Sequence, residues 1–336
     1  MYRSYLASPV TPVFDQVLLL CPDVITGGPE GVHQLAHQIN QLGGDARIVY
    51  YGPVSRMTVK GNAMSCRSEN SPLPAHYAKY QPKILDETTL TENTLIIYPE
   101  VLTTAAVLPA CGFQRAIWWQ SVDNALGHNP QMRDEEYVKT LFSNRTLFHL
   151  YQSEYTLFFL KHYEASNYFS MPDYTDPEFI VSKPLDKRPL NLCYPAPRGE
   201  MLEKLCRMRA GRRNNPCRTP IKGMSKEQVI NALSHARLYI DFGHHPGKDR
   251  GPREAALAGC VVMVNAVGAA ACFGDHPLDA KYKFTEADII SGSVIGTIDD
   301  ILEYPQPHFE AQYAYRQAIL LEREKFETAV SAFFFK

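Results

Sequence analysis

The chain contains a series of short, continuously apolar segments, each followed by a turn rich in glycine or polar residues. A strand buried on both faces has such an unbroken run, which is typical of parallel sheets covered by helices. After the first run, residues 32–42 carry apolar side chains at helical spacing and end at Gly43 and Gly44. This alternation predicts an α/β fold with parallel sheets. The predicted strands are Gln16–Cys21, Arg47–Tyr51, Thr94–Tyr98, Ala116–Trp119, Leu147–Tyr151, Leu190–Tyr194, Leu238–Phe242 and Cys260–Val264.

Two domains are predicted from the length of the chain and from one proline-rich segment. A chain of 336 residues corresponds to about two domains. Residues 171–190 contain four prolines and several charges, as linkers often do. We therefore predict an N-terminal domain over residues 1–180, a second domain over residues 181–310 and a C-terminal helix over residues 311–336. The helical pattern of this last segment begins near residue 308.

Three further segments have recognisable character. Residues 52–92 are rich in proline, serine and lysine and have weak periodicity, so we predict irregular loops there. Residues 225–236 predict a helix with Ser225 as its N-cap. Residues 200–213 predict a basic helix, whose arginines either form a solvated face or contact anionic lipid. These arginines are Arg207, Arg209, Arg212 and Arg213.

Composition argues against several classes of protein. The formal net charge is −2, which gives no support for a nucleic-acid-binding surface. The eight cysteines form no CxxC pair, and several lie in apolar runs, which fits a reducing cytoplasm. No apolar run approaches the ~20 residues that span a bilayer, and the first residues lack the apolar core of a signal peptide. We expect a cytoplasmic protein that is soluble or at most peripheral to the inner face of the membrane, and predict no oligomeric state.

The segment 238–265 carries the densest group of charged and histidine side chains in the chain. A strand-like run is followed by GHHPGKDRGPRE, by a short helix over residues 255–258 and by a second strand-like run. Ligands of open α/β sheets bind outside the carboxyl ends of strands, so we interpret this loop as the ligand-binding centre. Lys248, Arg250 and Arg253 are candidates for binding phosphate. The alternative is a solvated loop with internal salt bridges.

Three acidic or histidine positions of this segment have two interpretations each. Asp241 either faces the ligand, as nucleophile, base or hydroxyl acceptor, or is a buried carboxylate bonded to loop N–H groups. His244 and His245 either contact phosphate or sugar or are structural. Glu254 is expected just inside the start of the helix, where the helix dipole favours a carboxylate in any protein.

Parts of the sequence carry a family resemblance. Residues 27–52 read GGPEGVHQLAHQINQLGGDARIVYYG, residues 252–264 read PREAALAGCVVMV, and a long helix ends the chain. The first is similar to the opening of many nucleotide-sugar glycosyltransferases of the GT-B fold, and the second to the segment after the donor site in retaining family 4. The longer stretch DFGHHPGKDRGPREAALAGC also resembles bacterial enzymes of surface-polysaccharide assembly. The resemblance implies two Rossmann-like domains facing across a cleft, the first on the acceptor side, with the C-terminal helix packing back towards the interface.

The resemblance also implies roles for particular residues. Glu254 would accept hydrogen bonds from the ribose diol of a nucleotide. Gly27 and Gly28 would let the backbone approach the donor phosphate or the acceptor. Family 4 carries two glutamates eight positions apart, and Glu254 matches the later one. At the position of the earlier one this chain has Pro246. The side chains available in its place are His244, His245, Lys248 and Asp249.

Polar residues follow two strands of the first domain. Gln120, Ser121 and Asp123 come after the run AIWW, in a region that often supplies a cleft residue in family 4. An inverting transfer needs a group that takes the proton of the acceptor, and Asp123 is the natural candidate. Glu100, which also follows a strand, competes for that role. The predicted catalytic residues are therefore Asp123, Asp241 and His245.

The sequence thus predicts a glycosyltransferase that moves a sugar from a nucleotide donor to a bacterial glycan, such as capsule or O-antigen, or to a lipid-linked glycan. No metal is expected, because loop cations can stabilise the leaving phosphate and the Asp-x-Asp site of the other major glycosyltransferase fold is absent. Two alternatives stay open. One is a sugar-nucleotide epimerase of the same architecture, and the other is a non-catalytic subunit that binds a partner or a glycan.

Overall fold

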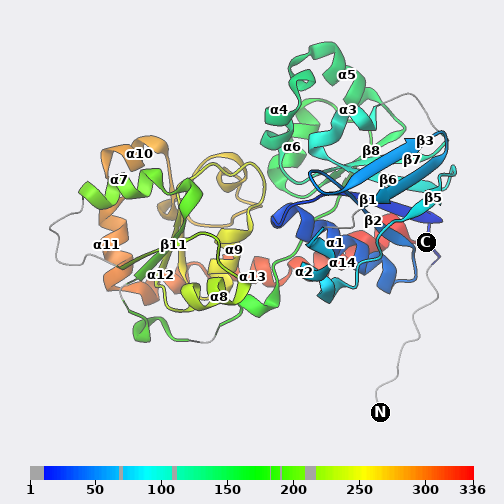
Figure 1. Ribbon diagram of the computed structural model, residues 1–336. Helices are drawn as coiled ribbons and strands as arrows, with labels where there is room; N and C mark the ends of the chain where they lie inside the picture. The colour runs from blue at the N-terminus through cyan, green and yellow to red at the C-terminus, as the bar shows by residue number, and fades with distance from the viewer. Residues whose placement is uncertain (1–10, 68–70, 108–111, 182, 190, 209–216) are drawn as a thin grey trace. The chain divides into compact units, whose positions relative to one another are not determined.

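The computed structural model describes residues 11–67, 71–107, 112–181, 183–189, 191–208 and 217–336. The chain forms two compact units, each built on a parallel sheet (Figure 1). The first unit comprises residues 1–152, 156–173 and 324–336, and the second comprises residues 153–155 and 174–323. These limits differ from the boundaries predicted at residues 180 and 310, because the end of the chain returns to the first unit.

The sheet of the first unit has the strand order β2-β1-β6-β7-β8-β9, and all its pairs are parallel. The strands predicted in this part of the chain are confirmed, and β9 was not predicted. Residues 17–21 of β1 are at most 2% exposed, which explains the unbroken apolar run. The strands are β1 (Gln16–Pro22), β2 (Ala46–Tyr51), β6 (Thr94–Pro99), β7 (Gln114–Trp119), β8 (Leu147–Tyr151) and β9 (Tyr168–Ser170).

Helices cover both faces of this sheet, with α1 and α14 on one face and α3, α4 and α5 on the other (Figure 1). Helix α1 begins at Gly27, earlier than predicted. The ring of Phe14 packs against those of Phe333 and Phe334, with centroids 5.9 and 6.1 Å apart, so the end of the chain completes this core. The helices are α1 (Gly27–Gln41), α3 (Thr103–Ala106), α4 (Val122–His128), α5 (Glu135–Ser143), α6 (Glu154–His162) and α14 (Glu322–Phe334).

Residues 52–92 are not the irregular loops that we predicted. They contain three short antiparallel strands and the helix α2 (Leu73–His76). The side chains of the first of these strands are almost all exposed, so the sequence shows no apolar alternation that would indicate a strand. The strands are β3 (Arg56–Lys60), β4 (Ala63–Arg67) and β5 (Glu87–Thr89).

The sheet of the second unit has the strand order β11-β10-β12-β13-β14, again with parallel pairs. Its three predicted strands are confirmed, whereas β11 and β14 were not predicted. Strand β14 pairs only with Val264 and Asn265 of β13. Nearby, the amide of Gln312 acts in place of a strand, because it binds both the N–H (2.9 Å) and the carbonyl (2.8 Å) of Val262. The strands are β10 (Asn191–Pro195), β11 (Cys217–Ile221), β12 (Leu238–Asp241), β13 (Val261–Asn265) and β14 (Lys283–Phe284).

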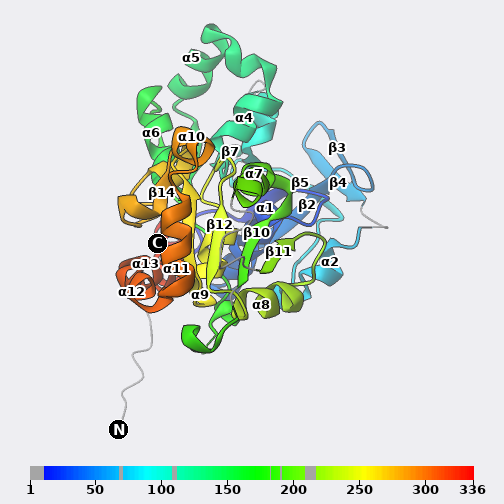
Figure 2. The same ribbon diagram turned by 90° about the vertical axis from the view of Figure 1, so that its left-hand side faces the viewer.

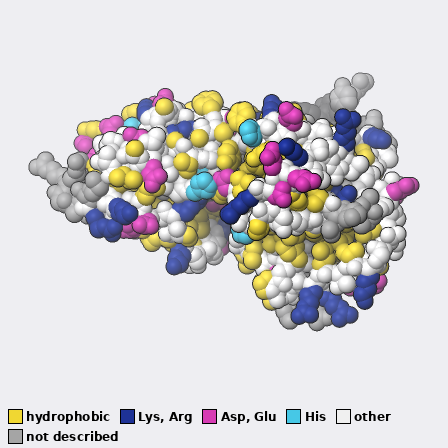
Figure 3. Space-filling model, turned by 90° about the horizontal axis from the view of Figure 1, so that it is seen from above, with side chains coloured by type: hydrophobic (Ala, Val, Ile, Leu, Met, Phe, Trp, Pro, Cys, Tyr) yellow, Lys and Arg dark blue, Asp and Glu magenta, His cyan; other side chains and the backbone are white. Residues whose placement is uncertain are grey.

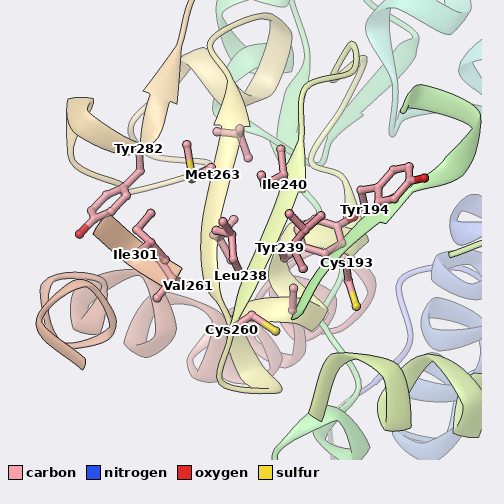
Figure 4. Close-up of a cluster of buried hydrophobic side chains, with 14 of the residues drawn as sticks. Cys193, Tyr194, Leu238, Tyr239, Ile240, Cys260, Val261, Met263, Tyr282 and Ile301 are labelled. Carbon is pink, nitrogen blue, oxygen red and sulfur yellow. The ribbon is translucent and has the colours of Figure 1, made fainter. Parts of the chain in front are cut away.

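Helices α8 and α9 lie on one face of this sheet and α7 and α10 on the other (Figure 2). Side chains of β12 and β13 extend from the sheet into the core that the helices close, and Leu238, Ile240 and Val261 are completely buried (Figure 4). Ser225 caps α8 in a capping box with Gln228, as predicted. The helices are α7 (Glu200–Met208), α8 (Lys226–Ser234), α9 (Arg250–Leu257), α10 (Glu286–Ser291) and α11 (Ile295–Glu303).

The long helix predicted at the end of the chain is confirmed, but two bends separate it into the helical segments α12 (Pro305–Ala311), α13 (Tyr313–Leu320) and α14. Helix α12 ends where the side chain of Gln312 turns to bind β13, and α13 follows. A second break separates α13 from α14, whose first residue, Glu322, is buried. In both places a buried polar side chain is bonded to another segment next to the interruption of the helical pattern.

Charged side chains of one sign do not gather on the face of the molecule that Figure 3 shows. Basic and acidic side chains are spread over the face shown in Figure 3, in keeping with the net charge of −2. Of the predicted basic cluster, Arg207 lies on α7, whereas Arg209, Arg212 and Arg213 lie outside the described residues. Among the helices that the structure describes, none is both long enough and apolar enough to cross a bilayer.

Candidate functional site

The loop between β12 and α9, residues 242–249, stands at the carboxyl end of β12. Helix α9 begins at Arg250, so Glu254 lies a full turn inside the helix, which corrects the predicted helix start. Pro252 is tolerated there because the first turn of a helix leaves its N–H groups without intrahelical partners. Arg250 and Glu254 are half-buried, and both keep part of their side chains accessible.

Arg198 organises this loop from a neighbouring strand end. It closes the short 3₁₀ turn that follows β10. Its guanidinium donates hydrogen bonds to Oδ2 of Asp241 (2.6 Å), to Oδ2 of Asp249 (2.5 Å) and to the carbonyl of His244 (2.7 Å). One planar side chain thus joins the end of β12 to the start of α9. Sequence reasoning missed Arg198, although its place directly after a strand of the same sheet was a usable signal.

His245, within the loop, completes the hydrogen-bond network of Arg198, Asp241 and Asp249. Its imidazole is completely buried, with Nδ1 3.0 Å from Oδ2 of Asp249 and Nε2 3.2 Å from the carbonyl of Asp241. Burial raises the pKa of Asp241, although the charges of His245 and Arg198 act in the opposite direction. Burial would also raise the pKa of Asp249, but hydrogen bonds from His245 and Arg198 outweigh it and lower that pKa. Asp249 is therefore the firmly ionised carboxylate of the network.

The predicted catalytic residues Asp241 and His245 both lie inside this network. Asp241 is 0% exposed and accepts a further hydrogen bond from the N–H of Gly243 (3.1 Å). Both ring nitrogens of His245 have partners within the loop. In this arrangement neither side chain faces solvent, and both stabilise the conformation of the loop through hydrogen bonds. Their catalytic role stays a prediction.

Two glycines allow the loop to pack this closely. A Cβ at Gly243 would lie 2.4 Å from Cδ of Arg198, so the arginine stem passes directly over the backbone there. A Cβ at Gly251 would lie 2.4 Å from the hydroxyl oxygen of Tyr239. Only a residue without a side chain leaves room at these two positions.

The predicted phosphate-binding cations differ in accessibility. Lys248 is 15% exposed, and its Nζ lies 2.9 Å from Oε1 of Glu322. Arg253 is completely buried, pairs with Oε2 of Glu322 at 2.9 Å and donates to the carbonyls of Lys248 and Asp249. Arg250 is half-buried at the start of α9. Lys248 and Arg250 thus keep part of their side chains accessible, whereas Arg253 supports the loop from inside the unit. The phosphate-binding role of the three residues stays a prediction.

Three strand ends of the first unit also come together. The side-chain amide of Gln120, after β7, donates to the carbonyl of Gly28 at 3.4 Å, and a Cβ at Gly28 would lie 3.0 Å from Oε1 of Gln120. The backbone N–H of Gln120 donates to the carboxylate of Glu100, after β6, at 3.4 Å. Glu100 is 6% exposed, and burial raises its pKa to about 7. A carboxyl group that titrates near neutrality therefore lies beside the predicted Gly27–Gly28 turn.

The remaining predicted residues of the first unit lie close to this group. Asp123 is half-buried in the first turn of α4, directly after the Gln120 segment. Gly27 is exposed at the first position of α1. The indoles of Trp118 and Trp119 are both buried. They donate to the carbonyl of Met171 and to Nδ1 of His149, respectively, so both belong to the core of the unit. The roles predicted for Asp123 and the two glycines stay predictions.

One group of side chains in the described part of the chain has metal-binding character. The ligand atoms of Asp241, His245 and Asp249 lie within 4.8 Å of one another. The guanidinium of Arg198 already pairs with both carboxylates, and this supplies the cation that such a cluster needs. A metal ion would have to displace Arg198, so the donor set fits a guanidinium better than a metal. The expectation of a metal-free reaction stays a prediction.

A second concave region lies along the edge of the second unit. An open groove of about 570 Å³ runs between β11 and α8. Lys222, which follows β11, lines it together with Asn191, Asn231 and His235. The groove adds a further concave surface to the unit that carries the loop after β12.

Comparison with known proteins identifies the fold. No protein-family model and no curated protein matches the chain. Among solved structures, sucrose-phosphate synthase from Thermosynechococcus elongatus matches with a TM-score of 0.63 at 14% identity, over 95% of this chain and 98% of that one. A glycosyltransferase from Rickettsia africae matches with a TM-score of 0.61 at 12% identity, over 94% and 98%. HepE from Anabaena, in complex with UDP-glucose, matches with a TM-score of 0.57 at 13% identity, over 94% and 97%.

These matches cover nearly the whole length of this chain and of each matched protein, so both units of the chain share the architecture of those proteins. The chain therefore has the GT-B glycosyltransferase fold, with two Rossmann-like α/β units and a helical C-terminal segment. At these identities the likeness fixes the fold, and the site must supply the function.

Proposed function

We propose that this chain is a glycosyltransferase that moves a sugar from a nucleotide-sugar donor to a bacterial glycan acceptor, such as a capsule or O-antigen chain. The observation that carries the proposal is the loop after β12, which Arg198 and His245 hold rigidly and which presents Lys248 and Arg250 at the start of α9. The position is supported by the fold, since HepE, which shares it, binds UDP and UDP-glucose.

The leaving diphosphate gains negative charge as the bond to the sugar breaks. Fixed cations and the N–H groups at the start of a helix stabilise that charge without reorganising during the reaction. We assign this role to Lys248, Arg250 and the first turn of α9. Arg253 contributes from below by fixing the backbone of Lys248 and Asp249. Glu254, half-buried on α9, would accept hydrogen bonds from the ribose diol.

The buried residues of the loop act as positioning residues in this scheme. Asp241 and His245 hold Arg198 and Asp249, and through them the shape of the loop. A site that keeps its donors within a few tenths of an ångström gains more from each charge than a mobile one. This assignment gives Asp241 and His245 an effect on the reaction without contact to the substrate.

The first unit would bind the acceptor. If the transfer inverts the sugar, a carboxylate must take the proton of the acceptor hydroxyl as its oxygen attacks the anomeric carbon. Asp123 is proposed for this step because it is partly accessible at the carboxyl end of β7. Glu100 is the competing candidate, since its pKa of about 7 suits a base at neutral pH. Gly27 and Gly28 would let the backbone approach the substrate.

A thermal-shift series tests this function. UDP-, GDP-, CMP- and dTDP-sugars are added to the full chain, and a rise in Tm with one base class is the expected result. Transfer is then assayed by release of the free nucleotide with and without a glycan acceptor. Release that needs the acceptor supports a transferase, whereas conversion of the sugar without one would support an epimerase. An absence of any Tm shift would contradict the proposal.

The acceptor side of the proposal extends to a lipid-linked glycan at the inner face of the membrane. Arg207 on α7 belongs to the basic segment that would contact anionic lipid. Sedimentation with vesicles containing an anionic phospholipid checks this extension. Equal sedimentation with neutral and anionic vesicles would contradict it and leave a water-soluble glycan as the acceptor.

A further inference from the structure

Glu322 gathers contacts from three separate segments of the second unit. It is the first residue of α14 and is 3% exposed. Its Oε1 lies 2.9 Å from Nζ of Lys248, and its Oε2 lies 2.9 Å from Nη1 of Arg253. The backbone N–H and the hydroxyl of Thr175 also donate to Oε2, at 3.0 and 2.9 Å. One carboxylate therefore faces Lys248 of the loop after β12, Arg253 of α9 and two neutral donors of Thr175.

This set of donors is one that a phosphate group would also attract. Carboxylate and phosphate oxygens accept from the same cationic and N–H donors, at similar distances. The carboxylate of Glu322 thus lies among the cationic side chains that we propose to bind the phosphates of the donor. Its effect on a second anion is repulsive, and its hold on Lys248 competes with that anion directly.

The two cations differ in how firmly they are held. Arg253 is completely buried and has two further hydrogen bonds to loop carbonyls, so its position is fixed. Lys248 is 15% exposed, and Glu322 is the acidic partner of its ammonium group. A lysine ammonium is a point charge on a flexible stem, and it can turn from one anion to another without moving its backbone. Lys248 is therefore the cation that a ligand could draw away from Glu322.

We propose that Glu322 is an internal counter-anion that competes with the donor's phosphates for Lys248 and so sets the nucleotide affinity of the site. Because the ligand is taken to be the diphosphate of the donor, this inference rests on the proposed function. Binding of a diphosphate moves the ammonium of Lys248 from Oε1 of Glu322 to a phosphate oxygen. Arg253 and Thr175 keep their hold on Oε2.

A purely structural role for Glu322 has a different signature. If its only task is to neutralise the buried Arg253, its removal lowers stability and leaves nucleotide affinity the same or weaker. A counter-anion gives the opposite change in affinity, because its removal frees Lys248 and lowers the local negative charge. The direction of the affinity change therefore separates the two roles.

Isothermal titration of the full chain with UDP and with inorganic pyrophosphate provides the test. Glu322→Gln keeps an oxygen for Thr175 and Arg253 but removes the charge. The expected result is a Kd for both ligands that is lower by about fivefold, the ratio of one modest ion pair. The matched control is Glu324→Gln, an exposed carboxylate on the same helix, which should leave both Kd values unchanged.

A second variant covers the case in which Glu322→Gln fails to fold. Glu322→Asp keeps a carboxylate for Arg253 but withdraws it by one methylene from Lys248. A smaller decrease in Kd in the same direction is expected for it. Unchanged or weaker binding of both ligands in each folded variant overturns the counter-anion.

The two hypotheses fail in different ways. Tighter pyrophosphate binding in Glu322→Gln, without binding of any nucleotide or nucleotide sugar by any form of the protein, supports the counter-anion and rejects the proposed function. UDP binding by the wild type with no gain in the variants rejects the counter-anion and retains the function. No binding of either ligand by any form rejects both.

Discussion

The guanidinium of Arg198 lies 2.6 Å from the carboxylate of Asp241, which is completely buried at the end of β12. Arg198 lies in the 3₁₀ turn after β10 and Asp241 is the last residue of β12, so the two meet because β10 and β12 are neighbours in the second sheet. The same arginine reaches Asp249 at the start of α9. The shape of the loop between β12 and α9 therefore depends on a side chain outside it.

Replacing Arg198 should strongly destabilise the second unit. Arg198→Met leaves the buried charge of Asp241 without its partner, and breaking a buried pair in this way costs about 3 kcal/mol or more. Urea unfolding measures the change. The control is Arg218→Met, whose pair with Glu203 is more than a third exposed, and it should cost less than about 1 kcal/mol. Equal losses in the two variants would contradict the importance of the network.

Gly243→Ala should disturb the loop through contact with the stem of Arg198. The added Cβ would lie 2.4 Å from Cδ of that arginine, so either the backbone or the guanidinium must shift. We expect a loss of stability of about 1–3 kcal/mol and of the Tm shift caused by a nucleotide sugar. In the control, Gly296→Ala, nothing lies within 4 Å of the new Cβ on α11. That variant should be more stable by about 0.5–1 kcal/mol, because alanine favours helix.

Glu100 predicts a pH dependence of stability with a definite sign. Burial raises its pKa from the ordinary 4.5 to about 7 in the folded protein. Below pH 4.5 the group is protonated in both states, and between pH 4.5 and 7 only the unfolded chain releases the proton. Stability therefore falls as the pH rises through this window, by on the order of 3 kcal/mol.

The variant Glu100→Gln removes this titration. Its advantage over the wild type in urea unfolding should grow between pH 5 and pH 8 and then stay constant. Because both proteins share all other ionisable groups, their difference isolates Glu100. A difference that is the same at pH 5 and pH 8 would contradict the raised pKa of Glu100.

The donor site is tested by two substitutions in the loop region. If the proposed roles hold, Lys248→Ala and Glu254→Ala should each reduce the Tm shift produced by the stabilising nucleotide sugar, since the first would remove a phosphate-binding cation and the second an acceptor for the ribose hydroxyls. A roughly tenfold weaker Kd is expected for Lys248→Ala. Lys204→Ala, an exposed lysine of the same unit, is the control. Wild-type shifts in both loop variants would place the nucleotide elsewhere.

Most strands of the two parallel sheets were predicted from the sequence, but few of the side-chain contacts between the strand ends were. Strands such as β1 and β12 are buried on both faces and therefore appear as unbroken apolar runs. β3 is exposed along almost its whole length and has no such signal. The long helix at the end of the chain was predicted from its pattern, whereas its two bends lie beside Gln312 and Glu322, whose side chains contact distant segments and leave no local signal.

The site shows the same division between local pattern and long-range contact. Lys248 and Glu254 stand in a motif-like stretch and could be named from it. Arg198 and Glu322 act on that stretch from positions far away in sequence. The place of Arg198 directly after β10 was a usable signal, whereas no local pattern marks Glu322. The burial of Asp241 and His245 also follows from tertiary packing, so a sequence alone cannot separate a positioning role from a catalytic one.

The return of residues 324–336 to the first unit constrains how the protein can be made. Phe326, Val330 and Phe334 are at most 1% exposed, so they belong to the first core although they follow the whole second unit in sequence. On the ribosome, the second unit is complete in sequence before the first can close. A fragment that stops after the linker would expose the apolar surface that these residues cover. The first core therefore stays unfinished until residues 324–336 have been made.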